Sequence, residues 1–137
     1  DRYATSKLVA ILHVYALARG TPAGGPRWFA YDPGLMPGTG LARTRSAFER
    51  WAWSTILPLA ARTMPGASTP RRSAETYARL LTGRLFPQET GVHLDFSGRR
   101  TESSADSKRR DWQDEVAAFA ARISQDWRPA VAEMASR

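Results

Sequence analysis

The sequence contains no cysteine, and this absence excludes several classes of site. Disulfides, thiolate metal ligands and a cysteine nucleophile are all impossible in this chain. The lack of cysteine is compatible with a reducing cytoplasm, where we expect the protein to act. The two histidines, His13 and His93, lie on different predicted elements, and neither has carboxylates at metal-ligand spacing. The sequence therefore predicts no metal site.

Long hydrophobic runs are also missing. No apolar run approaches the roughly 18 residues that a membrane-spanning helix needs. The longest run, 8–18, is interrupted by His13. The chain opens on Asp1 and Arg2 without a signal-peptide pattern, and a first residue so close to a helix start predicts that the chain begins within a domain. With 42% hydrophobic and 24% charged residues, the composition indicates a globular protein.

Lysine is scarce, since only Lys7 and Lys108 stand among the 20 basic residues. The formal net charge of +7 raises the question of nucleic acid. However, the arginines are spread from Arg2 to Arg137, and no basic stripe is interleaved with aromatic residues. We therefore expect no nucleic-acid binding.

Residues 3–19 are apolar on nearly all sides, which predicts a helix buried on more than one face, with Gly20 ending it as a left-handed C-cap glycine. Short apolar runs bounded by turn residues predict strands over 27–31 and 90–96. Further helices are predicted over 44–62, 70–82 and 108–127.

Capping and helix-breaking residues predict the bounds of the later helices. Thr69 before Pro70 is typical of an N-cap followed by proline in the first turn, and Gly83 should stop that helix. Pro129 should end the last helix, or start a short final turn. The polar stretch 97–107 is predicted to be a mobile loop.

Helices alternating with single strands indicate an α/β fold. Two strands cannot form a stable buried sheet alone. We therefore expect the 137 residues to be a single partial domain, whose other strands lie in sequence that is not here.

Tyr3 and Lys7 form the motif that we expect to act in proton transfer. Their i, i+4 spacing places them on one face of the first helix. A phenol with a pKa near ~10 is a poor acid or base at neutral pH, but a neighbouring ammonium favours the phenolate. Such a pair can pass a proton to a carbonyl, or take one from an alcohol, while a hydride moves.

A second motif follows in the strand 27–31, which leads through Asp32 into Pro33 and Gly34. A proline and a glycine stop a strand at the carboxyl edge of a parallel sheet, where ligands bind in open α/β folds. A glycine there lets the backbone approach a ligand closely.

The segment YATSK at 3–7, its apolar helix and the strand ending in Pro33-Gly34 resemble the catalytic helix and following strand of the short-chain dehydrogenase/reductase family. The stretch 33–43 is similar to the corresponding part of protochlorophyllide reductases and retinol-dehydrogenase-like members, although we do not carry over the photochemical activity. The resemblance implies the C-terminal half of a Rossmann-like, doubly wound parallel sheet domain.

The resemblance also implies roles for individual residues. Tyr3 would be the catalytic acid or base, and Lys7 would assist it and reach the cofactor ribose. Backbone groups of Pro33, Gly34, Leu35 and Met36 would surround the nicotinamide. The family usually places a threonine where Gly38 stands, so the phosphate contact falls to Gly38 or to Thr39, one place later.

The implied cofactor is NADP or NAD, and the residue that would distinguish them belongs to the half that is missing. Phe48, Trp51, Trp53 and Ile56 suggest a small hydrophobic carbonyl or alcohol as substrate. The family's glycine-rich phosphate turn, and its active-site serine and asparagine, have no counterpart in this chain.

Two functions stay open at this point. The first is an oxidoreductase, with a homodimer formed through the first helix. The second is a non-catalytic remnant that binds a partner through exposed apolar helix faces. The coding sequence upstream of Asp1 would distinguish them.

Overall fold

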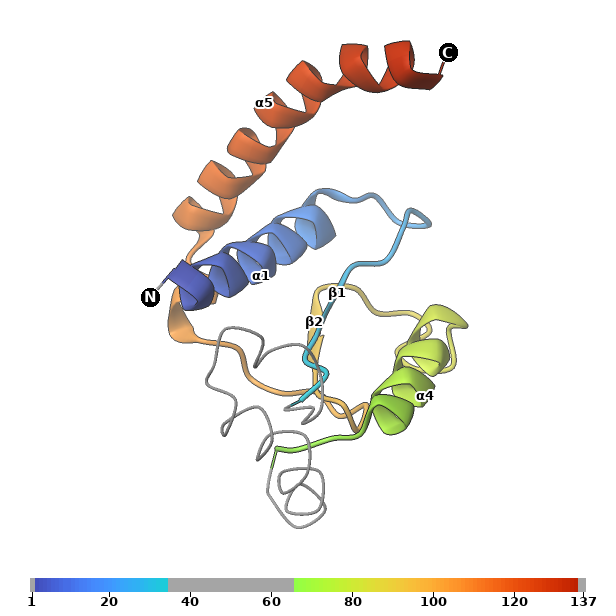
Figure 1. The fold of residues 1–137 in the computed structure, drawn as a ribbon. Helices are drawn as coiled ribbons and strands as arrows, with labels where there is room; N and C mark the ends of the chain where they lie inside the picture. The colour runs from blue at the N-terminus through green and yellow to red at the C-terminus, as the bar shows by residue number, and fades with distance from the viewer. Residues whose placement is uncertain (1, 35–65, 136–137) are drawn as a thin grey trace, which may run out of the picture. The chain divides into compact units, whose positions relative to one another are not determined.

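The structure of the chain, a computed structural model, describes residues 2–34 and 66–135, with side chains through residue 125. Within these ranges the elements are α1 (Arg2–Gly20), β1 (Phe29–Tyr31), α4 (Pro70–Leu81), β2 (Val92–Leu94), the 3₁₀ helix η2 (Ala105–Lys108) and α5 (Arg110–Ala135) (Figure 1). The α/β class is confirmed, and both strands fall inside their predicted ranges.

The strands β1 and β2 pair with each other in a two-stranded sheet. The Gly91 N–H donates to Trp28 O at 2.8 Å, and the Asp32 N–H donates to Leu94 O at 2.8 Å. Both bonds advance in the same direction along the two strands, so the pair is parallel. In β2 the buried Val92 and Leu94 alternate with a half-buried His93, which agrees with the alternation expected from the sequence.

The chain divides into two compact units, which we describe separately. One unit comprises Asp1–Ala30, Thr90–Val92 and Glu102–Arg137. The other comprises Tyr31–Glu89 and His93–Thr101.

In the first unit, α1 packs against α5 and η2 (Figure 1). A chain of hydroxyls joins them: Tyr15 Oη lies 2.7 Å from Ser103 Oγ, which lies 2.7 Å from the fully buried Ser107 Oγ. Arg19 of α1 hydrogen-bonds Gln113 and pairs with Asp114 at the start of α5. Polar side chains therefore fix the junction between the helices.

Burial of α1 on more than one face is not seen among the residues that the structure describes, as expected if its further neighbours belong to the half that is missing. Only Leu12 and Ala16 of this helix are buried, and Val9 is 40% exposed. The neighbours of α1 in its unit are α5 and η2, and its other apolar residues Leu8, Ile11, Val14 and Leu17 are half-buried.

The end of α1 also differs from the prediction. Gly20 belongs to the helix and does not adopt a positive φ. The Thr21 hydroxyl instead donates to Leu17 O at 2.6 Å and accepts from Trp28 Nε1 at 2.8 Å. A side-chain hydroxyl thus satisfies a terminal carbonyl that a left-handed glycine would otherwise help to cap.

In the second unit, α4 begins at the predicted Pro70 and ends one residue before the predicted 82. Thr69 Oγ1 accepts from the Arg72 N–H at 3.3 Å, Pro70 stands in the first turn, and Gly83 has a φ of 71° just beyond the end. The helix buries Ser73, Thr76 and Leu80 along one face.

Two predictions about the later part of the chain need correction. The stretch 97–107 is loop, as predicted, except that Leu94 bridges Arg100 in antiparallel fashion and η2 begins at Ala105. Helix α5 does not end at Pro129 but continues to Ala135. A proline removes one backbone donor, and a helix can continue on both sides of that gap.

No helix among the described residues is both long enough and apolar enough to span a membrane.

Candidate functional site

Tyr3 and Lys7 lie side by side on the exposed face of α1. Lys7 Nζ stands 5.1 Å from the centroid of the Tyr3 ring, in a cation–π contact. The Tyr3 side chain is 61% exposed, and the Ser6 hydroxyl donates to its carbonyl at 2.7 Å. The predicted i, i+4 contact is therefore present, with the ring open to solvent.

The charge of α1 has one sign. Its ionised residues are Arg2, Lys7 and Arg19, and no carboxylate occurs between residues 2 and 20. Arg19 is paired with Asp114, so Arg2 and Lys7 provide the positive charge near Tyr3. A cationic helix face attracts anionic ligands.

The Pro33-Gly34 turn follows β1 in the second unit. The Gly34 N–H donates to Asp32 Oδ1 at 2.9 Å, which is an Asx turn. Gly34 has a φ of 74°, in the left-handed region that favours glycine. The turn is therefore built from an aspartate and a glycine two residues apart.

The space beside Gly34 is already filled. A Cβ at this position would lie 2.6 Å from Phe96 Cδ1 and 3.0 Å from Gly66 O. The glycine is required by packing within the chain itself, and on this side it leaves no cradle for a cofactor. The contacts with Phe96 and Gly66 therefore account for the glycine at this position without a ligand.

Ser73 holds the turn from α4. Its hydroxyl donates to Pro33 O at 2.8 Å and lies 2.8 Å from Ser68 Oγ. Because Ser73 has one hydroxyl proton and gives it to Pro33, Ser68 must be the donor in the second contact. Both serines are buried, so this short chain of bonds fixes the Pro33 carbonyl to the start of α4.

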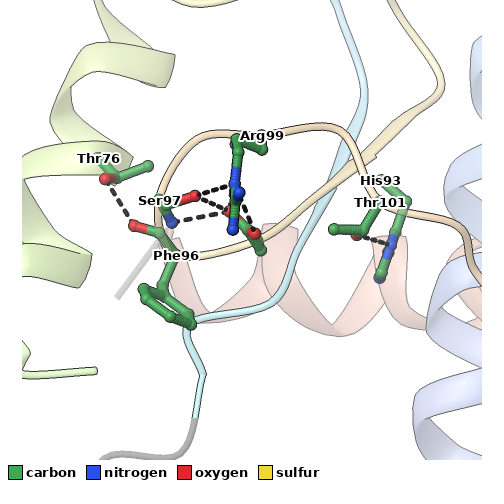
Figure 2. Close-up of polar contacts among 7 residues, drawn as sticks. Thr76, His93, Phe96, Ser97, Arg99 and Thr101 are labelled. Carbon is green, nitrogen blue, oxygen red and sulfur yellow. Dashed lines mark hydrogen bonds and ion pairs between the residues drawn. The ribbon is translucent and has the colours of Figure 1, made fainter. Parts of the chain in front are cut away.

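The turn after β2 holds the backbone of Phe96 through side-chain hydrogen bonds (Figure 2). Asp95 Oδ1 accepts from the Ser97 N–H at 2.8 Å, the Ser97 hydroxyl at 2.6 Å and the Arg99 N–H at 3.1 Å. The Thr76 hydroxyl donates to Phe96 O at 2.7 Å, and Thr101 Oγ1 lies 2.8 Å from His93 Nδ1. These bonds fix the backbone that carries the Phe96 ring.

Asp95 has a shifted pKa. Burial raises the pKa of this carboxyl. Hydrogen bonds from the Ser97 hydroxyl and from the Arg99 and Ser97 N–H groups lower the pKa, as does the charge of Arg99, and together they outweigh the effect of burial. The net result is a pKa below the ordinary value of 3.8. The ionised form is thus the one that the folded turn stabilises.

The predicted site residues are distributed as follows. Tyr3 and Lys7 belong to the first unit, and Pro33 and Gly34 belong to the second. The other predicted residues lie outside the described residues: Leu35, Met36, Gly38, Thr39, Phe48, Trp51, Trp53 and Ile56.

The sequence interpretation missed the residues that support the turn, Ser73, Asp95 and Phe96. The signal for Asp95 is present, since an aspartate with a serine two residues later and a glycine three residues later is typical of a side-chain-capped turn. The partners of Pro33 and Gly34 carry no local signal, because they lie far away along the chain.

Within 2–34 and 66–135, no three metal-ligating side chains come together. Comparisons with protein-family models, with curated proteins and with solved structures find no match to this chain.

Proposed function

We propose that this chain is the C-terminal half of an NAD(P)-dependent oxidoreductase of the short-chain dehydrogenase/reductase type. Tyr3 is its acid or base, and Lys7 assists. The observation that carries the proposal is the exposed Tyr3 ring with the Lys7 ammonium 5.1 Å from its centroid, on a helix free of carboxylates. The order of this helix and the following Pro33-Gly34 turn agrees with the proposal.

Each residue has a definite task in the proposed reaction. The bound dinucleotide supplies or accepts the hydride. The Tyr3 hydroxyl gives a proton to the carbonyl oxygen of the substrate, or takes one from an alcohol in the reverse direction. The Lys7 ammonium lies 5.1 Å from the centroid of the Tyr3 ring, and its N–H groups can donate to ribose hydroxyls.

The proposed fold is half of a doubly wound parallel sheet. The parallel pairing of β1 with β2 and the turn at the carboxyl end of β1 support this, since open α/β sheets bind ligands at that edge. The substrate is a small hydrophobic carbonyl or alcohol, a proposal that rests on the apolar sequence between 44 and 62.

The test uses the natural protein that contains this chain. We expect Tyr3→Phe to lower turnover by a factor of ~10²–10⁴, since it removes the proton donor, while cofactor affinity is kept. Lys7→Ala should weaken both turnover and cofactor binding. Oxidation of NADPH and NADH in the presence of apolar carbonyls and of sugars measures turnover, and titration calorimetry measures binding.

Tyr77→Phe is the matched control, because Tyr77 is a 48% exposed tyrosine on α4 with no part in the proposal. Near-normal turnover of Tyr3→Phe would rule out the catalytic assignment. A preference for sugars would overturn the substrate class alone.

A partner-binding module is the second candidate function. Exposed apolar side chains favour it, with Val9 40% exposed on α1 and Phe119 53% exposed on α5. Absence of any turnover in the natural protein, together with a stable complex, would favour this candidate.

A further inference from the structure

An apolar stripe runs along the described part of α5. Its members are spaced by four, three and four residues and comprise Trp112, Val116, Phe119 and Ile123. Phe119 is 53% exposed and Ile123 is 41% exposed, whereas Trp112 and Val116 are half-buried. This spacing is typical of a helix that packs along a second helix.

Two opposite charges lie on one flank of the stripe. Glu115 precedes Val116 and Arg122 precedes Ile123, so both stand on the same side, two helical turns apart. Both are exposed, and the Arg122 guanidinium lies 5.5 Å from the centroid of the Phe119 ring, alongside the stripe. The opposite flank carries the uncharged Gln113 and Ala120 at the equivalent positions. Gln113 is buried there, accepts from Arg19 of α1 and donates to Ser107 O, so the chain's own α1 packs on that side.

This arrangement complements itself under a two-fold axis. In an antiparallel pair of helices, each flank faces the same flank of the other helix, whereas in a parallel pair it faces the opposite one. An antiparallel second copy of α5 would therefore bring Glu115 opposite Arg122, twice. The position halfway between Glu115 and Arg122 lies within one residue of the middle of the stripe 112–123. A single two-fold axis at this position therefore brings together both the apolar stripes and the charged pairs of the two helices.

We infer that α5 is a self-association surface, on which a second copy of this chain packs its own α5 in antiparallel orientation. The contact is isologous, with Phe119 and Ile123 in its core and two Glu115–Arg122 pairs on its flank. This inference is independent of the proposed oxidoreductase activity.

The first helix is a poorer surface for a second copy. Its ionised side chains are Arg2, Lys7 and Arg19, so pairing α1 with its own copy would bring together charges of one sign only. Such pairing would also cover Tyr3. The charge pattern thus favours α5 over the first helix that the sequence analysis proposed for the dimer.

Charge reversal tests both the surface and its orientation. In sedimentation velocity of the full chain over a concentration series, we expect Glu115→Arg and Arg122→Glu each to weaken self-association about tenfold, because each puts like charges opposite each other twice. Mixing the two variants should restore association, since every flank pair is then of opposite sign. The double variant should associate like the unaltered chain.

Arg110→Glu is the control, because it changes the net charge by the same amount as Arg122→Glu but lies away from the stripe. Circular dichroism checks that each variant keeps its helices, and the neutral Glu115→Gln and Arg122→Gln replace any that do not. The inference would be overturned if the unaltered chain stays monomeric over the whole concentration series. It would also be overturned if none of the charge variants changes the association. Weakening by the single variants without recovery on mixing would overturn the antiparallel orientation.

Discussion

Gly34 shows how one residue can satisfy a sequence motif for a reason other than the expected one. The motif predicts a glycine that lets a cofactor approach the backbone. In the structure, its missing Cβ makes room for Phe96 and Gly66, and its φ of 74° allows the Asx turn with Asp32. The sequence therefore predicted that this turn requires a glycine, but it did not predict which residues pack against it.

We expect Gly34→Ala to destabilise the fold by about 2–4 kcal/mol, since the left-handed backbone strain adds to the clash with Phe96 and Gly66. Gly24→Ala is the matched control, with a φ of 83° and open space where a Cβ would stand, and should cost only about 1–2 kcal/mol. Urea unfolding measures both. Equal losses would show that Phe96 moves aside without cost.

Asp95 makes the stability of its turn depend on pH. Its pKa is lowered on folding, so its contribution is complete above the ordinary value of 3.8 and disappears as the pH falls through the folded value. We expect Asp95→Ala to cost about 1–3 kcal/mol at pH 7 and progressively less below 3.8. Urea unfolding across this range provides the test, with the exposed Asp106→Ala as control. A cost that does not change with pH would contradict the ionised turn.

At the scale of elements, the residues next to a helix predicted where it starts better than where it ends. Thr69 and Pro70 predicted the first turn of α4 because N-capping depends on neighbouring residues. The end of α1 depends on Thr21, whose hydroxyl is held by Trp28 across a loop. Pro129 likewise gave the wrong end for α5, because one missing donor does not stop a helix.

Thr69→Ala should destabilise α4 and its unit by about 1 kcal/mol, because it leaves the Arg72 N–H without its side-chain acceptor. Thr69→Ser keeps an oxygen at the same position and should leave the stability of α4 unchanged or slightly higher, because serine ranks above threonine at an N-cap. Thermal and urea unfolding compare the two variants. An alanine variant as stable as the serine variant would show that the cap bond contributes nothing.

At the scale of the whole molecule, the sequence predicted residue pairs within one element and missed those between elements. Tyr3 and Lys7 share a helix face, so their contact followed from spacing alone. The hydrogen bond from Ser73 to Pro33 joins positions far apart in the chain, and no periodic pattern in the sequence predicts it. The side on which α1 packs is likewise absent from its own sequence, since burial depends on which elements are its neighbours.

The cofactor-binding capacity of residues 1–137 is limited by what the described elements provide. A doubly wound domain holds a dinucleotide across several strands, with the pyrophosphate on a glycine-rich turn at a helix N-terminus. Here β1 and β2 are three residues long, and the sequence has no glycine-rich turn between a strand and a helix. The buried apolar residues of the described ranges are few and mostly small: Leu12, Ala16, Ala30, Ala67, Leu80, Val92 and Leu94.

We therefore expect residues 1–137 alone to bind neither NADPH nor NADH tightly and to turn over no substrate. Tyr3 and Lys7 can contact a ribose, but two side chains on an exposed helix face cannot replace the pyrophosphate site, and solvent weakens each contact. Titration calorimetry with both dinucleotides, beside hydrogen exchange on the same sample, measures this. Micromolar binding together with a well-protected core would mean that these residues form a complete cofactor domain, and the proposed division of the oxidoreductase into two halves would then be wrong.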